Sequence, residues 1–183
     1  MRAVVLRTHG GPEVLAIEEV PDPSPGPPEG IVGVAATALN RADLLQRRGL
    51  YPGPPMAVEI PGMEYAGTIA AVGERVERWS VGDAVMGIVG GGAYAEQIAV
   101  DERQVMAVPE AVGLPDAAAI PAAFLTPFHA LLVPGGLPRT RSRLRNTRKD
   151  AETSQETGAG QERQQQPGCS GLSIVVTGLV GRH

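Results

Sequence analysis

Short apolar runs, several with polar residues at alternate positions, recur along the first 108 residues and are separated by clusters of glycine and proline. Runs of this kind, rich in β-branched residues and bounded by turn residues, are typical of β-strands. The pattern predicts strands at residues 1–7, 15–20, 31–37, 65–72, 84–89, 94–100 and 105–108. Short strands with frequent turns between them favour an irregular antiparallel β-barrel.

One early segment has helical spacing instead. Residues 42–48 are predicted to form a short helix whose Leu44 and Leu45 side chains face inward. Gly49 follows at the position where a residue with positive φ commonly ends a helix. The fold class predicted so far is mainly β with short helices.

Residues 114–133 change character to an alanine-rich, apolar sequence. Pro115 favours a helix start, because its fixed φ suits the first turn. Pro121 and Pro127 lack the N–H that a helix interior needs, so they interrupt the pattern. We therefore expect two short helices with a bend between them.

The composition changes abruptly near Gly136. Residues 1–137 contain eight arginines, no lysine and sixteen acidic residues, a net charge of −8. Residues 138–168 contain seven basic and four acidic residues, a net charge of +3, and apart from proline only three apolar side chains. So few apolar groups cannot offset the entropy of ordering the chain. We predict a globular domain at residues 1–137 and an aberrant polar and basic tail, disordered, at residues 138–183.

This tail ends in an apolar run at residues 172–181, which we interpret as a stray apolar tail or an added edge strand. A frameshift or an alternative splice near residue 137 would explain the simultaneous change in charge and apolar content, and resequencing the locus tests that hypothesis. The basic residues between Arg139 and Lys149 are alternatively a nucleic-acid arm, but no aromatic residue accompanies them for base stacking. We expect a solvated tail and no nucleic-acid partner.

The single cysteine, Cys169, excludes an internal disulfide and a multi-thiolate zinc site within one chain. No apolar stretch reaches the roughly 18 residues that a membrane-spanning helix needs. The N-terminal run starts as a strand and not as a basic, then apolar, signal. We expect a cytoplasmic protein with no membrane partner.

Six motifs, taken in their order along the chain, carry a family resemblance. They are Ala38-Leu39-Asn40-Arg41-Ala42-Asp43, Gly49-Leu50-Tyr51-Pro52, Pro61-Gly62-Met63-Glu64-Tyr65-Ala66-Gly67, Val72-Gly73, Val81-Gly82-Asp83-Ala84-Val85 and Ala117-Ala118-Ala119-Ile120-Pro121. Together they resemble the N-terminal domain of medium-chain dehydrogenases/reductases, and most nearly the zinc-independent, zeta-crystallin-like NADPH:quinone oxidoreductases. The resemblance covers residues 1–137 and implies a GroES-like irregular β-barrel.

The same resemblance bears on zinc. Zinc-dependent alcohol dehydrogenases of this superfamily have a cysteine in the segment equivalent to residues 40–43, and a histidine where this chain has Met63. A thioether and an amide do not replace imidazole and thiolate in a tetrahedral Zn²⁺ site. The four-cysteine structural loop of those enzymes is also absent from this sequence. We therefore expect no metal site.

Two polar residues match positions that lie near the nicotinamide and the substrate in the zinc-independent branch. The resemblance implies that Asn40 and Tyr51 are catalytic, both donating hydrogen bonds toward a developing quinol oxygen, and that Tyr51 also contacts the cofactor. Each has a structural alternative. Asn40 can satisfy backbone groups at a strand end, and the Tyr51 hydroxyl can cap a turn at the barrel edge.

Thr126 lies where family members line the nicotinamide pocket, so the resemblance implies a cofactor contact; its alternative is a hydroxyl bonded back along its own helix. Asp43 precedes a helix and is expected to cap it. Glu64 matches a residue beside the metal site of zinc-dependent relatives, and here we expect a structural role. None of the three histidines is assigned a catalytic role.

The implied activity is NADPH-dependent hydride transfer to a quinone or enone substrate. After Gly136 the family continues with a strand and a glycine-rich turn that binds the cofactor pyrophosphate, and this chain has no such fingerprint there, so its Rossmann domain is absent. We expect this chain alone to bind no NADPH and to be inactive. The alternative is a non-catalytic GroES-like binding or interaction module. We also expect self-association through a cleft face left exposed around Phe124 and Phe128.

Overall fold

The computed structural model describes residues 1–133 and the backbone of residues 173–175. The predicted domain boundary at residue 137 and the predicted disorder of the polar tail lie outside the described residues. The strands are β1 (Arg2–Leu6), β2 (Leu15–Glu19), β3 (Glu29–Ala38), β4 (Glu64–Val72), β5 (Ala84–Ile88), β6 (Gln97–Asp101), β7 (Val105–Ala107) and β8 (Ser173–Val175). The helices are α1 (Arg41–Arg47), α2 (Leu114–Ala117) and α3 (Ile120–Leu132), with 3-10 turns at Pro12–Val14 and Glu102–Gln104. The prediction of a mainly β chain with short helices is confirmed.

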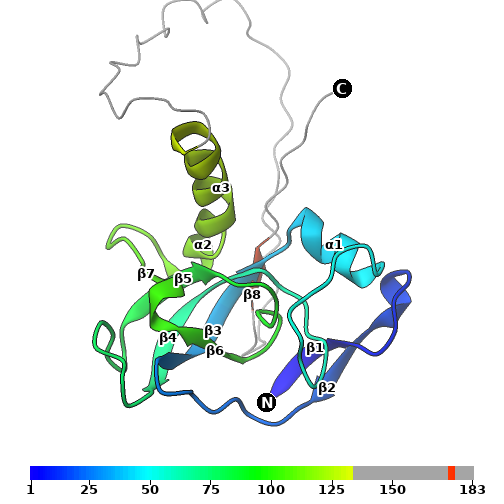
Figure 1. The fold of residues 1–183 in the computed structure, drawn as a ribbon, viewed down its shortest axis with the longest axis horizontal. Helices are drawn as coiled ribbons and strands as arrows, with labels where there is room; N and C mark the ends of the chain where they lie inside the picture. Colours follow the sequence, from blue (N-terminus) through cyan, green and yellow to red (C-terminus); the bar gives the residue numbers. More distant parts are fainter. Residues whose placement is uncertain (134–172, 176–183) are drawn as a thin grey trace, which may run out of the picture. The chain divides into compact units, whose positions relative to one another are not determined.

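The strands form two sheets (Figure 1). In the larger sheet the order is β6-β3-β4-β5-β7, and all four neighbouring pairs are antiparallel. β1 and β2 form a separate antiparallel hairpin. Isolated bridges from Ala3 to Ala95 and from Leu6 to Glu59 connect this hairpin to the loops around the larger sheet. Both β3 and β4 are buried along most of their length, as expected for central strands.

The largest core cluster lies within the larger sheet and its loops. Its buried members are Val32, Val34, Tyr65, Ile69, Val85, Val89, Ala93, Ile98, Val100 and Val105. The small residue Gly67 allows β3 and β4 to approach each other closely, because a Cβ at Gly67 would overlap the carbonyl oxygen of Gly33. Glycine in these central strands therefore reflects close packing of the backbone, and not a turn.

The prediction for the first helix is confirmed in extent, but of the two leucines expected to face inward only Leu45 is half-buried. Leu44 is 39% exposed, whereas Asp43 is 4% and Gln46 is 1% exposed. The helix buries these polar groups because each has a specific partner in the surrounding loops. Its end follows the expectation for Gly49, whose φ is +71°. The N–H groups of Gly49 and Leu50 return to helix carbonyls at 2.8 and 2.9 Å, which is a Schellman motif.

The alanine-rich segment forms two helices, as predicted. α2 ends at Ala117, and α3 begins at Ile120, so Pro121 lies in the first turn of α3, where its missing N–H costs little. Pro127 does not interrupt the second helix, which continues to Leu132. A proline removes one hydrogen bond without ending a helix that has other turns on both sides.

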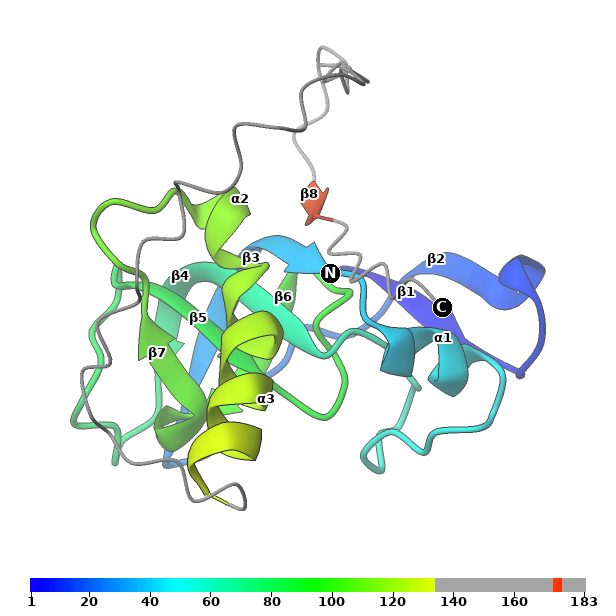
Figure 2. The same cartoon turned by 90° about the horizontal axis from the view of Figure 1, so that it is seen from above.

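Part of the apolar run at residues 172–181 forms the expected edge strand. Ser173–Val175 make up β8, which pairs in parallel with the last residues of β3, Ala36, Thr37 and Ala38. Figure 2 shows β8 beside that end of β3. β6 pairs with the earlier part of the same edge, from Glu29 to Gly33, so the two strands share one edge of β3.

Candidate functional site

Three elements meet at the carboxylate of Glu64. This residue starts β4, while Asn40 precedes α1 and Ala122 lies in the first turn of α3. The Asn40 Nδ2 donates to Glu64 Oε1 at 2.8 Å, and the Ala122 backbone N–H donates to Glu64 Oε2, also at 2.8 Å. The Glu64 side chain thus holds Asn40 and Ala122, which lie 24 and 58 positions away from it in the sequence.

Glu64 is completely buried, with 0% of its surface exposed. A buried carboxylate is costly unless hydrogen bonds replace its water, and here each oxygen accepts one. Its backbone carbonyl also accepts a hydrogen bond from the Thr37 hydroxyl at 2.6 Å. The second donor is an N–H at the start of a helix, where the helix dipole favours negative charge. The surroundings of the carboxylate therefore supply N–H donors to both of its oxygens.

The structure gives Asn40 a structural role at the start of α1. It is the N-cap of α1 and forms a capping box with Asp43, whose Oδ2 accepts the Asn40 backbone N–H at 2.7 Å. Asp43 does contribute to the cap, but it does so from the third position inside α1 and not from ahead of the helix as expected. The amide nitrogen of Asn40 is not spent on the backbone, since it donates to Glu64. Asn40 as a whole residue is partly exposed, and its amide nitrogen is anchored on Glu64.

Asp43 itself is held by a second buried polar pair. Tyr94 donates from its hydroxyl to Asp43 Oδ2 at 2.9 Å. Burial raises the pKa of Asp43, and hydrogen bonds from the Asn40 backbone, Tyr94 and the Gly62 backbone oppose that rise. Burial, together with the charges of Asp43 and Glu64, raises the pKa of Tyr94 well above its usual range. Tyr94 therefore acts as a fixed donor and not as an acid.

Gly62 makes this arrangement possible. Its φ is +102°, and a Cβ there would lie 2.5 Å from Tyr94 Cδ1 and 2.6 Å from the Tyr94 backbone nitrogen. Any larger residue would be strained in its backbone and would displace the tyrosine. The glycine next to Met63 thus positions the Tyr94 hydroxyl on Asp43.

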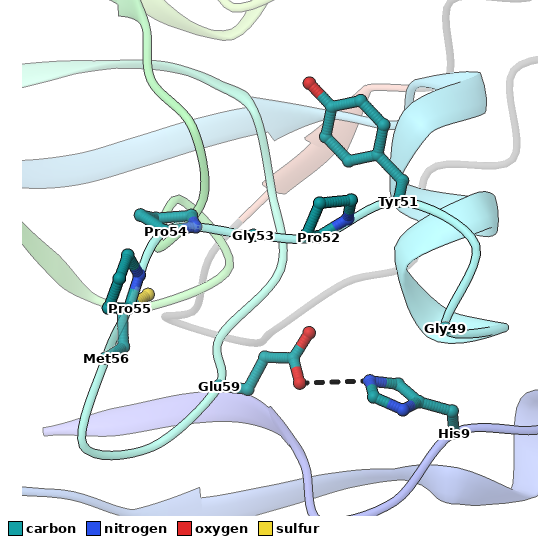
Figure 3. Close-up of a pocket in the computed structure, with 9 residues that line it drawn as sticks. All are labelled: His9, Gly49, Tyr51, Pro52, Gly53, Pro54, Pro55, Met56 and Glu59. Atoms are coloured by element: carbon teal, nitrogen blue, oxygen red, sulfur yellow. Dashed lines mark hydrogen bonds and ion pairs between the residues drawn. The ribbon is translucent and has the colours of Figure 1, made fainter.

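Tyr51 lies on the loop that follows α1 and lines a pocket of about 390 Å³. Figure 3 shows its ring pointing away from the opposite wall, where His9 Nε2 and Glu59 Oε2 are 3.1 Å apart. Tyr51 is 38% exposed, and within the described residues its hydroxyl has no hydrogen-bond partner. The alternative role of capping a turn is therefore not seen in this part of the chain.

The pocket has apolar walls and one polar end. The apolar wall consists of Pro52, Pro54, Pro55 and Met56. Glu59 at the polar end already has two protein partners, since Oε1 accepts from Gln46 at 3.1 Å and Oε2 contacts His9. His9 packs against Gly49, where a Cβ would lie 3.1 Å from the imidazole. The pocket is within the size range of small-ligand sites, roughly 300–1,000 Å³, and its polar groups serve chiefly to hold the loop.

Thr126 is exposed on α3, four residues after Ala122, so the two lie on the same helix face. Within the described residues its hydroxyl makes no hydrogen bond back along the helix. The structure thus joins Asn40 to the helix that carries Thr126, through Glu64. No hydrogen bond links Tyr51 to either residue among residues 1–133.

The sequence-based interpretation missed how much depends on Glu64. A single acidic residue between Gly62 and Ala66, in an otherwise apolar run, is a signal that could have identified it. Lone charged residues at the start of a buried strand need a partner, and the nearest polar candidate at a neighbouring element end was Asn40. The second partner, a backbone N–H of α3, has no signature in side-chain patterns.

Among residues 1–133 and 173–175, no group of three or more His, Cys, Asp or Glu side chains is placed to hold a metal ion. The positions that match zinc ligands in the resembling alcohol dehydrogenases are here the Asn40 segment and Met63. In the same part of the chain no helix is long and apolar enough to cross a membrane. The absence of a bound metal remains a prediction that needs its own test.

Comparison with known proteins gives the relationship of the chain. Residues 26–110 match the family model of the alcohol dehydrogenase GroES-like domain. The synaptic vesicle membrane protein VAT-1 homolog of Rattus norvegicus is 37% identical over 139 residues, 75% of this chain and 34% of that protein. A quinone oxidoreductase of Pseudomonas aeruginosa is 37% identical over 120 residues, 65% of this chain and 37% of that protein. The chain spans about a third of the length of these curated relatives.

The solved structures agree with this relationship. The quinone oxidoreductase of Escherichia coli, crystallised as a complex with NADPH, superposes with a TM-score of 0.67 at 32% identity, covering 72% of this chain and 40% of that one. Both the strand order and the six ordered motifs now have a common explanation. The N-terminal segment of the chain therefore carries an alcohol dehydrogenase GroES-like domain, and its relatives include quinone oxidoreductases and VAT-1 homologues of the medium-chain dehydrogenase/reductase superfamily.

Proposed function

We propose that this chain is the substrate-side part of an NADPH-dependent oxidoreductase of the quinone reductase type, which transfers hydride to quinones or enones. The observation that carries the proposal is the partly exposed residue Asn40, whose amide nitrogen is anchored on the buried Glu64 carboxylate. Reduction of a quinone puts negative charge on its oxygen, and a preoriented N–H donor stabilises that charge best. The similarity to quinone oxidoreductases supports the same reaction class.

In this proposal Asn40 and Tyr51 are the two donors to the substrate oxygen. Asn40 keeps one amide N–H after its bond to Glu64, and Tyr51 has an exposed hydroxyl without a partner in the described residues. The cofactor, when bound, supplies the hydride. Thr126 and Tyr51 are proposed to contact its nicotinamide end, and the site is proposed to work without zinc.

The cofactor affinity of this chain by itself is proposed to be very low. Charge-assisted hydrogen bonds to phosphate contribute roughly 1.5–3 kcal/mol each. No glycine-rich fingerprint for a pyrophosphate follows the GroES-like domain in this sequence, so those bonds have no donors. We propose that the chain alone is inactive, as a truncated or frameshifted product would be, and that it is cytoplasmic.

The test is a pair of titrations on the purified chain. Duroquinone is a suitable probe, because its fully substituted ring resists addition of the Cys169 thiol. We expect it to bind at millimolar concentration, with weaker binding to Asn40→Ala and Tyr51→Phe than to the wild type. Ile17→Ser, on the exposed face of β2 at 76% exposure, is the control variant and should bind as the wild type does.

NADPH, followed by fluorescence, should show no saturable binding to the chain alone. Saturable micromolar binding would contradict the proposed loss of the phosphate site, and quinone turnover would then be the next assay. Equal duroquinone binding by all four proteins would remove Asn40 and Tyr51 from the proposed site.

A second candidate is a non-catalytic binding module, favoured by the apolar surface of α3. Phe124 is 67% exposed and Leu131 is 52% exposed. Exposed apolar patches of this kind mark contact surfaces or promote association. We propose self-association through this helix, which sedimentation of the wild type and of Phe124→Ser tests. A wild-type monomer at all concentrations would contradict it.

A further inference from the structure

We propose that Glu64 is a positioning residue that fixes which end of the Asn40 amide faces the substrate. The proposal rests on the proposed role of Asn40 as a donor. An asparagine amide presents an N–H donor in one orientation and a carbonyl acceptor in the other, and the two differ by a simple flip about the Cβ–Cγ bond. Only the first orientation stabilises a developing oxyanion, because the second places two oxygen atoms against each other.

The geometry around Glu64 selects the donor orientation. Glu64 Oε1 accepts from Asn40 Nδ2 at 2.8 Å, and a carboxylate offers nothing to the amide oxygen because it has no hydrogen to donate. A flipped amide would bring its oxygen toward a buried negative group. Glu64 therefore holds Nδ2 in place and leaves the second N–H of the same nitrogen as the free donor.

Both oxygens of this carboxylate are needed. The other one, Oε2, accepts the backbone N–H of Ala122 at 2.8 Å. Among side chains of this size, only a carboxylate can accept at both ends, since a glutamine has a single acceptor oxygen. The helix N–H of Ala122 cannot turn away, whereas the Asn40 amide can rotate. In Glu64→Gln the remaining oxygen is therefore expected to serve Ala122, and the glutamine NH₂ faces Asn40 and reverses its preference.

This view also explains why a charged side chain is kept at 0% exposure next to the capping box. A purely structural link between β4 and α3 needs only one acceptor, for Ala122. The hydrogen bond from Asn40 to Glu64 is not required for this link between β4 and α3. Asp43 supports the backbone of Asn40, and Glu64 orients its side chain, so the two acids act on different groups of one residue.

Nuclear magnetic resonance of the full chain can test the orientation directly. The sequence contains only two asparagines, Asn40 and Asn146, so labelling asparagine alone with ¹⁵N gives two side-chain NH₂ pairs, which Asn146→Ser assigns. In the wild type we expect one proton of the Asn40 pair to be shifted downfield and to exchange more slowly than its partner. An Asn40 pair without a downfield proton would overturn the proposal, without any need for a variant to fold.

Two variants then separate orientation from structure. Glu64→Gln should remove the downfield shift of the Asn40 side-chain pair and leave its backbone amide nearly unchanged. Asp43→Asn is the matched control, because the Asp43 carboxylate accepts from the Asn40 backbone N–H and not from the Asn40 amide, so this variant should move the backbone signal and not the side-chain pair. An Asn40 side-chain pair that stays in place in Glu64→Gln would refute the positioning role.

The same signals distinguish the failure of this inference from the failure of the proposed function. Duroquinone should shift the Asn40 side-chain pair in the wild type, and its apparent Kd should rise about fivefold in Glu64→Gln, as expected for the loss of one neutral hydrogen bond. A pair that responds to Glu64→Gln but not to duroquinone supports the positioning by Glu64 and contradicts the proposed substrate site. A response to duroquinone with equal Kd in both proteins contradicts the positioning alone.

Discussion

Two buried tyrosines allow the energy of the Asp43 contact to be measured against an internal reference. Tyr94 is 7% exposed and donates to Asp43 Oδ2 at 2.9 Å. Tyr65 is 0% exposed, and its hydroxyl has no partner in the described structure. Tyr→Phe removes the same oxygen from each site and leaves the ring. Tyr94→Phe should therefore lose stability, and Tyr65→Phe should not.

The expected sizes follow from what each hydroxyl does. Tyr94→Phe removes a hydrogen bond to an acidic group, which costs roughly 1.5–3 kcal/mol of unfolding free energy. Without Tyr94, Oδ2 keeps the Asn40 backbone N–H at 2.7 Å, and the other oxygen, Oδ1, is buried without a partner in the described structure. Tyr65→Phe removes a buried polar group that makes no bond, so its stability should be unchanged or higher by about 1 kcal/mol.

The assay is urea unfolding at pH 7, followed by the fluorescence of the single tryptophan. Trp79 packs against the main core cluster and donates from Nε1 to the Glu102 carbonyl at 3.0 Å, so its environment reports unfolding of the larger sheet. For a chain of this length, Tyr94→Phe should also lower Tm by roughly 5–10 °C. A Tyr94→Phe protein within about 0.5 kcal/mol of wild type, or a Tyr65→Phe protein that is the less stable of the two, would refute the reasoning.

The deficit of Tyr94→Phe should also depend on pH. Burial raises the folded-state pKa of Asp43 above its unfolded value, so the folded protein binds this proton more tightly. Stability linked to Asp43 is therefore fully present below the unfolded pKa and is lost as the pH rises through the folded one. The Tyr94 hydroxyl stabilises the ionised form, so its removal should cost most at neutral pH and progressively less as Asp43 becomes protonated. A deficit independent of pH would show that the bond is not to a carboxylate.

Three further outcomes are expected. Gly67→Ala should destabilise the fold by about 2–4 kcal/mol in the same urea assay, because its Cβ would overlap the Gly33 carbonyl oxygen; a change below about 1 kcal/mol would mean that β3 and β4 can separate. Gln46→Ala should lower the free energy of unfolding by about 1–3 kcal/mol, and Leu44→Ala should lower it by less than about 1 kcal/mol, because Gln46 is 1% and Leu44 is 39% exposed. A larger loss in Leu44→Ala than in Gln46→Ala would support the predicted leucine face. Adding Zn²⁺ or a chelator should leave Tm unchanged, and a rise in Tm with saturable Zn²⁺ would reveal a metal site.

The strands could be predicted from the sequence because their apolar runs end at glycine and proline clusters. β1, β2, β4 and β5 begin and end within one residue of the predicted ranges. β6 begins three residues late, at Gln97, because the backbone before it bonds elsewhere: Tyr94 donates to the Pro61 carbonyl, and Glu96 donates to the Arg2 carbonyl of β1. An apolar run does not show which partner its backbone will pair with, so this limit could not be predicted.

The buried face of the first helix was predicted wrongly for a related reason. Apolar periodicity assigns the buried face to leucine, yet Asp43 and Gln46 are buried because their partners come from distant loops. For the site, the family motifs located Asn40, Tyr51 and Thr126, whereas the bond from Ala122 to Glu64 joins a backbone group to a side chain 58 residues away. Contacts of this kind depend on tertiary packing and leave no spacing rule in the sequence.

The position of β3 has a consequence for the order in which the chain folds. β3 pairs with β4 at a sequence separation of 28 residues between Thr37 and Tyr65, and with β8 at 137 residues between Ala38 and Val175. Loop closure over the longer distance costs about 1.4 kcal/mol more, and only three residues of β8 offset it. We expect the β3–β4 pair to nucleate folding on a millisecond-to-second scale, as in other chains dominated by distant contacts. Until β8 arrives, the last residues of β3 remain an open edge on which another extended segment can add.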